Sequence, residues 1–174
     1  METLDCIKSR RSRRLFLNKE VEDEKINQIL ECAITAPSSM DCQPWHFVIV
    51  KDESLRKQIA DIKDDDNKQQ FLTAPVLIVV CVDSKKSPSR VVDDGVTATQ
   101  NILLAAHDLE LGSVYMCGSK PTDPKVADDI RKILDIPAFF TPITILPIGY
   151  PDESEKLDDK NLINLDLIKH HNRW

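Results

Sequence analysis

The sequence predicts a layered domain of the α/β or α+β class, in which helices pack against one central sheet. Three observations support this prediction. The 174 residues fit a single domain, strand-sized apolar runs are separated by segments of helical period, and no internal repeat is present. The composition, 41% hydrophobic and 30% charged, is ordinary for a soluble globular protein.

The elements of the N-terminal half follow from the apolar spacing. Leu4 and Ile7 fit a short opening helix that ends in a basic run. A second helix, 22–34, has acidic residues in its first turn and stops at Pro37. A polar turn, 38–42, leads into a strand at 44–50, and a short amphipathic helix is expected at 55–62. Residues 61–70 read as a polar, acid-rich loop.

The C-terminal half begins with the most apolar segment of the chain. Residues 75–82 are continuously aliphatic, which is typical of a strand buried on both faces. A long helix is expected at 93–109, with Gly112 as its C-terminal cap. A strand at 113–117, a helix at 125–134 and a strand at 143–148 complete the domain. The charged tail that follows has few apolar anchors and is not expected to fold on its own.

Charge, glycine and cysteine usage exclude several classes of protein. The net charge of -6 argues against a nucleic-acid partner, and no run reaches the length of a membrane span. The four glycines lie too far apart for a phosphate-binding loop, so each is expected where the backbone needs positive φ or a close approach. Five scattered cysteines and no apparent signal peptide favour reduced thiols in the cytoplasm. No metal is expected, because no ligand-like spacing joins the cysteines to His46, His107, His170 and His171.

The basic run allows two interpretations. Five of the 23 Lys and Arg residues fall within residues 8–14, inside an acidic chain. The run could be a solvated surface turn, as most charge runs are. It could also be an anion site, because arginine forks match phosphate oxygens and Ser12 adds a hydroxyl donor. The polar turn is equally ambiguous by itself, since Ser38 could simply cap a loop and Trp45 could be core.

Together, these two segments resemble motifs of one family. Residues 10–16, RRSRRLF, resemble the opening motif of FMN-dependent nitroreductases. Residues 37–39, PSS, followed by 43–47, QPWHF, resemble the second motif at the expected separation. Further matches follow in the family's order at 72–75, 94–106, 111–112, Gly118 and 149–151. The resemblance spans nearly the whole chain and accounts for all four glycines.

The resemblance implies a nitroreductase-like α+β fold with a central, mainly antiparallel or mixed sheet of four to five strands flanked by helices. Residues 1–174 would form a single FMN-binding domain, with 152–174 as a C-terminal arm exchanged with the partner subunit of a homodimer. The apolar residues of the arm would be buried on that partner, and two flavins would lie at the subunit interface.

By the same resemblance, FMN would be held by residues from several parts of the chain. The phosphate would be contacted by Arg10, Ser12 and Arg14, with Arg11 in support and Arg173 as a second basic contact from the arm. The flavin ring would lie beside Ser38, Ser39 and Met40, contributed across the subunit boundary, and near Gln43. The pyrimidine edge would be read by Asn67, and the backbone at Cys117 and Gly118 would approach the ring.

The implied reaction is ping-pong transfer of a hydride from NADH or NADPH, through flavin N5, to a small acceptor such as a nitroaromatic or a quinone. No catalytic side chain is required. Two departures from the family affect the site: Asp41 stands where relatives usually carry Asn, and the short stretch 51–74 suggests a more open pocket. Alternatives are another flavin reaction on the same fold (dehalogenation, dehydrogenation or cleavage of the flavin itself), a flavin-binding protein without turnover, and an anion-dependent interaction module without cofactor.

Overall fold

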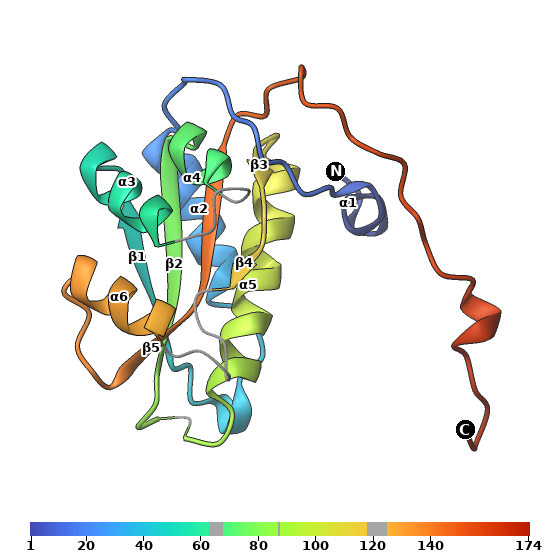
Figure 1. Cartoon of the computed structure of the whole chain (residues 1–174). Helices are drawn as coiled ribbons and strands as arrows, with labels where there is room; N and C mark the ends of the chain where they lie inside the picture. Colours follow the sequence, from blue (N-terminus) through green and yellow to red (C-terminus); the bar gives the residue numbers. More distant parts are fainter. Residues whose placement is uncertain (63–67, 87, 118–124) are drawn as a thin grey trace.

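The computed structural model describes residues 1–62, 68–86, 88–117 and 125–174, and its central feature is an antiparallel sheet (Figure 1). The sheet has five strands in the order β1-β2-β5-β3, with β4 also paired to β5. The strands are β1 (Trp45–Val50), β2 (Val76–Asp83), β3 (Gly112–Ser113), β4 (Met116–Cys117) and β5 (Phe140–Gly149). The α+β class with a mainly antiparallel sheet is therefore confirmed.

Helices cover both faces of this sheet. One face packs against α2 (Asp23–Ala33) and α5 (Val91–Asp108), and α1 (Thr3–Ser9) lies against α5. The other face packs against α3 (Glu53–Asp61), α4 (Gln69–Thr73) and α6 (Lys125–Ile133). Two short 3-10 turns, η1 (Ser39–Asp41) and η3 (Leu165–Leu167), lie outside these layers.

Strand β2 explains how two cores form around one sheet. Successive side chains of a strand point to opposite faces, so Ile78 and Val80 join the core under α2 and α5. Leu77 and Val79 instead join the core under α3, α4 and α6. Every residue of β2 before Asp83 is buried, as the continuous aliphatic run predicts.

Three expectations for local structure are wrong. The loop expected at 61–70 ends earlier, because helix α4 begins at Gln69 and is anchored by Phe71, which is fully buried in the second core. The strand expected at 113–117 is two short strands, β3 and β4, which both pair with β5. Helix α5 is closed by Glu110, with a φ of 63°, and Leu111 N–H donates to the Ala106 carbonyl at 2.8 Å.

Gly112 therefore has another role than capping α5. It lies in β3, where an added Cβ would be 2.9 Å from the Cβ of Arg13. None of the described glycines has a positive φ, so close approach, rather than left-handed backbone, accounts for them. At Gly112 this approach lets the basic run lie directly on the edge of the sheet.

The arm, residues 152–174, leaves the domain beyond β5 and passes α1, and its end lies apart from the folded body (Figure 1). Its larger apolar side chains are exposed in the single chain, among them Leu162, Ile163, Leu165, Leu167 and Ile168. Only η3 gives it regular structure within the described residues. In the described ranges, no helix combines the length and apolar character that crossing a bilayer requires.

Candidate cofactor-binding site

The basic strip, residues 10–14, runs in extended conformation along the edge of the sheet. Arg13 N–H donates to the Ser113 carbonyl at 3.0 Å, and Ser12 forms an isolated parallel bridge with Ser113. Because side chains alternate along an extended backbone, Arg11 and Arg13 lie on one side of the strip. Arg10, Ser12 and Arg14 share the opposite side.

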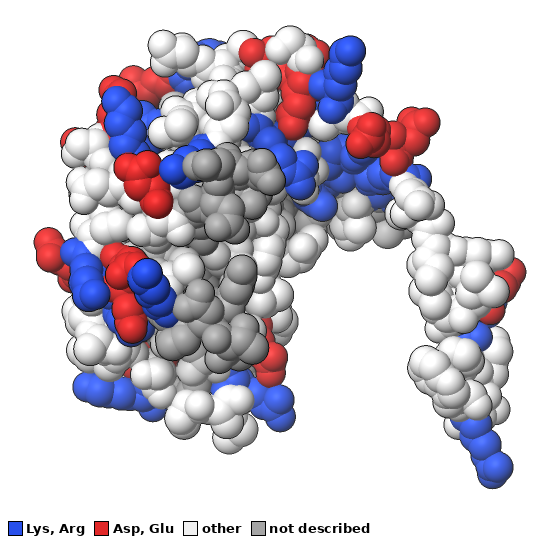
Figure 2. Space-filling model, viewed as in Figure 1, with Lys and Arg blue, Asp and Glu red and all other residues white. Residues whose placement is uncertain are grey.

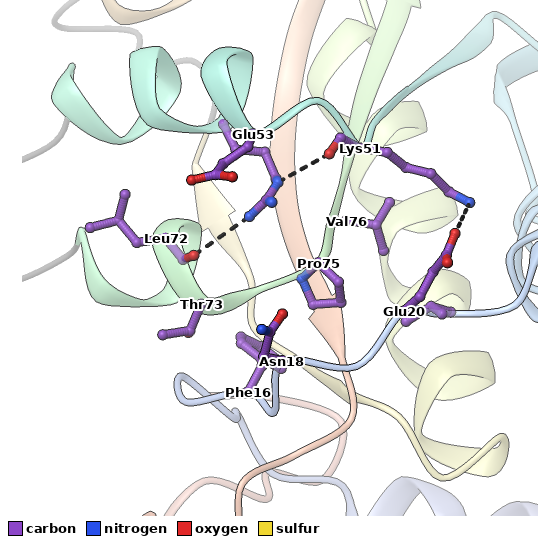
Figure 3. A pocket seen from close by; sticks show the side chains of 11 residues that line it. Phe16, Asn18, Glu20, Lys51, Glu53, Leu72, Thr73, Pro75 and Val76 are labelled. Carbon is purple, nitrogen blue, oxygen red and sulfur yellow. Dashed lines mark hydrogen bonds and ion pairs between the residues drawn. The ribbon is translucent and has the colours of Figure 1, made fainter.

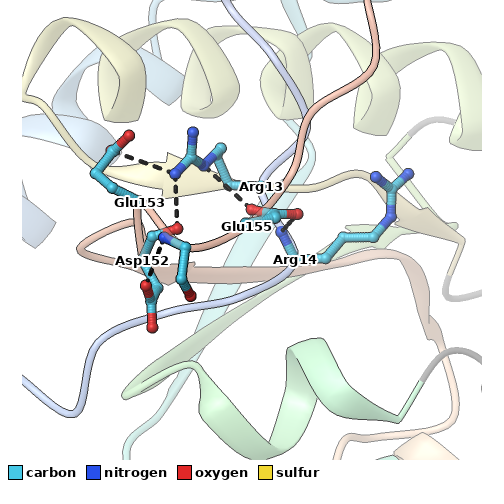
Figure 4. Close-up of polar contacts among 6 residues, drawn as sticks. Arg13, Arg14, Asp152, Glu153 and Glu155 are labelled. Atoms are coloured by element: carbon cyan, nitrogen blue, oxygen red, sulfur yellow. Dashed lines mark hydrogen bonds and ion pairs between the residues drawn. The ribbon is translucent and has the colours of Figure 1, made fainter.

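The side with Arg11 and Arg13 is occupied by the arm. The Arg13 guanidinium donates from Nη2 to the Asp152 carbonyl at 2.9 Å and to Glu153 Oε1 at 3.3 Å. Its Nε lies 3.2 Å from Glu155 Oε2 (Figure 4). Arg11 Nη2 donates to a carbonyl further along the arm, that of Asp158. Figure 2 shows basic side chains gathered where the arm leaves the body.

The other side of the strip has no protein partner within the described ranges. There, the side chains of Arg10, Ser12 and Arg14 make no hydrogen bond or ion pair. Figure 4 shows the Arg14 side chain directed away from the acidic residues of the arm. Two guanidinium groups and a hydroxyl thus share one face, and this set of donors fits a phosphate group.

A histidine close to the strip has a shifted pKa. His107, late on α5, lies 2.8 Å through Nε2 from the hydroxyl of Ser9. Burial, reinforced by the positive charges of Arg10 and Lys160, lowers the pKa of His107. The imidazole is therefore neutral near pH 7, and it adds no charge of its own beside the strip.

The polar turn, residues 38–42, has a strained backbone that side chains hold in place. Met40 and Asp41 have φ values of 55° and 53°, a region that residues other than glycine enter at a cost. Ser39 N–H donates to Asp94 Oδ1 at 2.8 Å, and the Asp94 side chain is buried in the first turn of α5. The carboxylate therefore fixes the turn to the N-terminal end of the helix.

Two more contacts of this region concern predicted site residues. Gln43 N–H donates to Ser38 Oγ at 3.0 Å, and Gln43 Nε2 donates to Asp41 Oδ1 at 3.1 Å. Asp41 is thus engaged by its neighbour, although it cannot supply the amide donor that Asn would. Met40 is 96% exposed, so its apolar side chain is not buried among the described residues of the single chain.

The structure does not bring the turn and the strip together within one chain. The strip lies at the His107 end of α5 and the turn lies at the Asp94 end (Figure 1). The thirteen residues from Asp94 to His107 span about 20 Å of helix at 1.5 Å each. The two halves of the predicted site are therefore separated along α5.

The remaining predicted residues are distributed as follows. Cys117 is half-buried in β4, opposite Thr144 of β5, and so lies on the same sheet edge as the strip. Arg173 lies near the end of the exposed arm, away from the strip of its own chain (Figure 1). Asn67 and Gly118 are outside the described residues.

Sequence reasoning did not single out Arg13, Glu153 and Glu155, whose contacts join segments about 140 residues apart. It also missed a cavity of about 520 Å³ near the start of β2, which contains none of the predicted site residues. There, Arg56 donates to the Ala74 carbonyl at 2.6 Å. Lys51 pairs with Glu20 at 3.7 Å (Figure 3). The charged side chains of that cavity are thus largely paired within the protein itself.

Over the described stretches of chain, no cluster of His, Cys, Asp or Glu is arranged to hold a metal ion.

Comparison with known proteins supplies independent findings. The sequence model of the nitroreductase family matches residues 7–70 and 62–150. A protein of Methanothermobacter thermautotrophicus named "Putative NADH dehydrogenase/NAD(P)H nitroreductase" is 39% identical over 100% of this chain and 88% of its own length. A crystal structure from Parabacteroides distasonis with the same name has a TM-score of 0.90 at 34% identity, covering 100% of this chain and 99% of that one.

A further solved structure carries ligands. It is an iodotyrosine deiodinase bound to FMN and 3-iodo-L-tyrosine, with 25% identity and a TM-score of 0.81. The similarity covers 99% of this chain and 100% of that chain. Solved structures thus match this chain over almost its whole length, including the sheet, the strip and the arm.

Proposed function

The chain belongs to the nitroreductase family, and we propose that it is an FMN-dependent NAD(P)H oxidoreductase that reduces a small acceptor such as a nitroaromatic or a quinone. The flavin supplies the hydride chemistry, and the protein supplies binding, orientation and electrostatics. The observation that carries this proposal is the face of the strip on which Arg10, Ser12 and Arg14 have no protein partner among the described residues. Their neighbours Arg11 and Arg13 are engaged by the arm.

The proposal includes a homodimer with FMN at its interface. The phosphate residues and the polar turn lie about 20 Å apart along α5. A ring bound beside Ser38, Ser39 and Met40 of the same chain would be far from the strip. The spacing therefore favours a ring beside the turn of a second copy, and the 96% exposed Met40 would be buried there.

The arm provides further support for the dimer. An open groove of about 500 Å³ lies between α1, α2 and α5 and is lined in part by Ile7, Leu104 and Ala105. Burial of the exposed arm residues Leu165, Leu167 and Ile168 on a second copy would stabilise the pair by about 25 cal/mol per Å² of apolar surface. Arg173 would then reach the partner's site from the end of the arm.

The dimer is tested by light scattering on the full chain and on a chain ending at residue 160, which keeps the contacts of Arg13 with the start of the arm. We expect a dimer for the full chain and dissociation together with loss of FMN for the shortened one. A full chain that is monomeric while loaded with FMN would contradict the proposal.

The phosphate site is tested by fluorescence titration of FMN and of riboflavin, which lacks the phosphate. Arg10→Ala and Arg14→Ala should each weaken FMN by about 1–3 kcal/mol, the scale of a lost charge-assisted bond, and leave riboflavin unchanged. Arg90→Ala is the matched control, because Arg90 is exposed and its one ion pair among the described residues is with the nearby Asp93. Unchanged FMN affinity in both strip variants would place the phosphate elsewhere.

The reaction is tested by anaerobic stopped-flow mixing with NADH and NADPH, followed by an acceptor panel. Rapid bleaching of the flavin supports the oxidoreductase, whereas bound FMN without bleaching indicates a flavin-binding protein. Absence of FMN binding would favour the interaction module. 3-Iodo-L-tyrosine belongs in the panel, because a structural relative binds it, and its reduction would favour dehalogenation.

The thiol pattern supports a cytoplasmic location, which fractionation of cells would test.

A further inference from the structure

The first residues of the arm place two carboxylates and a main-chain carbonyl beside the basic strip. The guanidinium of Arg13 contacts the Asp152 carbonyl, the Glu153 carboxylate and the Glu155 carboxylate. These two glutamates differ in their surroundings. The Glu153 side chain is 83% exposed, whereas those of Glu155 and Arg13 are each 13% exposed.

Glu155 makes a second contact that Glu153 does not make. Its Oε1 accepts the main-chain N–H of Arg14 at 2.9 Å, while its Oε2 lies 3.2 Å from Arg13 Nε. One carboxylate thus joins the side chain of one strip residue to the backbone of the next (Figure 4). It therefore fixes the Arg13 side chain on the side of the strip that faces the arm. It also fixes the backbone of Arg14, whose side chain points to the opposite side.

The pair is held by its own attraction. Arg13 Nε and Glu155 Oε2 are buried, and neither has a hydrogen-bond partner of good geometry among the described residues. A buried charged atom that loses its partner is costly. Removal of Glu155 would leave Arg13 Nε without its charge partner, and it would also remove the acceptor of Arg14 N–H. The strip would then relax toward water.

We propose that Glu155 and Arg13 are positioning residues for the flavin phosphate: by fixing the strip from the arm side, they hold Arg14 and its neighbours Ser12 and Arg10 on the phosphate side. This inference rests on the proposed function. It makes the start of the arm part of the phosphate site although no arm residue up to Glu155 faces the phosphate.

Charge and positioning predict opposite results for Glu155→Ala. Removing a negative charge near a phosphate site strengthens phosphate binding by Coulomb's law. Removing the acceptor of Arg14 N–H frees the strip and weakens binding. We expect Glu155→Ala to raise the FMN dissociation constant by about tenfold, the scale of one hydrogen bond to a charged group, and to leave the riboflavin dissociation constant unchanged.

Two variants with the same change in charge separate these effects. Glu155→Gln retains an oxygen that can accept Arg14 N–H, so its FMN dissociation constant should rise by less than about threefold. Glu153→Ala removes a carboxylate that also contacts Arg13 but does not touch Arg14, so it should remain within twofold of the parent. If Glu155→Ala does not fold, Arg13→Lys is tested in its place, because Lys keeps the positive charge but lacks the planar guanidinium and its several N–H donors. We then expect a selective loss of FMN affinity of severalfold.

The outcomes distinguish this inference from the proposed function. If Arg14→Ala weakens FMN and Glu155→Ala does not, the positioning role is wrong and the phosphate site remains. If neither variant changes FMN affinity, the phosphate site itself is wrong. Equal losses of FMN and riboflavin in Glu155→Ala would show a general structural role and would also overturn the inference.

Discussion

Replacement of Asp94 should release the polar turn, because this carboxylate opposes backbone strain. The turn and the residue after it contain three non-glycine residues with left-handed φ, Met40, Asp41 and Gln43. At about 1 kcal/mol each, the strain amounts to about 3 kcal/mol. Asp94 is 4% exposed, and its side chain accepts Ser39 N–H at 2.8 Å.

The magnitude follows from the contacts that oppose this strain. The bond to the Asp94 carboxylate contributes about 1.5–3 kcal/mol, as hydrogen bonds to charged groups do. The other contacts of the turn, among them Gln43 N–H to Ser38 Oγ and Gln43 Nε2 to Asp41 Oδ1, remain in Asp94→Ala. Loss of the Asp94 carboxylate removes about 1.5–3 kcal/mol of the contacts that oppose about 3 kcal/mol of strain. The turn should therefore open more readily in Asp94→Ala.

Hydrogen exchange measured by mass spectrometry on peptides covering residues 36–44 tests this expectation. Exchange should be fast in Asp94→Ala and intermediate in Asp94→Asn, which keeps one acceptor oxygen. Asp93→Ala is the control, because Asp93 is an exposed acid in the same helical turn. Under the proposed function, FMN affinity should fall in parallel with protection of the turn. Unchanged exchange in Asp94→Ala would refute the balance of strain and contacts.

Three further predictions concern stability and thiol chemistry. The pKa of His107 is lowered from about 6.5 by burial and nearby cations, so stability is full above that value and falls as the pH drops through the folded pKa; urea unfolding of His107→Gln should show a flatter profile between about pH 7 and 5. Gly149→Ala would place a Cβ 2.6 Å from Pro75 Cδ, so calorimetry should show a loss of about 1–3 kcal/mol, and an unchanged melting temperature would contradict this. Burial raises the pKa of Cys81 to about 12, so iodoacetamide at pH 8 should label the exposed Cys32 and spare Cys81 until the protein unfolds.

Long segments with a clear period were predictable from sequence because local pattern and burial agree there. Strand β2 and helix α5 lie close to their expected ranges, 75–82 and 93–109. The short elements were not predictable, because distant contacts decide them. Five residues of α4 form a helix around the buried Phe71, and β3 and β4 exist only through pairing with β5.

The end of α5 shows how a correct signal can be assigned to the wrong role. Gly112 was expected to cap the helix, since glycine is the preferred residue for left-handed backbone. Glu110 adopts that conformation instead, two residues earlier. Gly112 is required by a long-range contact, the approach of Arg13 to the sheet edge. The sequence shows that residue 112 is a glycine, but it does not show which neighbouring residue requires one there.

The candidate site likewise has parts that the sequence predicted and parts that only the structure shows. Residue types and their order predicted the strip and the turn, and alternation along an extended chain could have separated Arg11 and Arg13 from Arg10, Ser12 and Arg14. The partner of Arg13 could not be read from the sequence, because many acidic residues of the tail are equivalent by composition. Only the structure selects Glu155, through its burial and its contact with Arg14 N–H.

The strip follows from a conflict that an acidic protein must resolve to bind a phosphate. The net charge of -6 repels an anion at long range, and the arm brings acidic groups within contact of the basic residues. Alternation resolves this conflict, because one side of the strip neutralises the arm and the other side keeps its donors for a ligand. A strip with the same arginines in a helical conformation would mix the two sides. The extended backbone, fixed by Ser113 at the sheet edge and by Glu155 from the arm, is therefore what gives the basic run a phosphate-binding face.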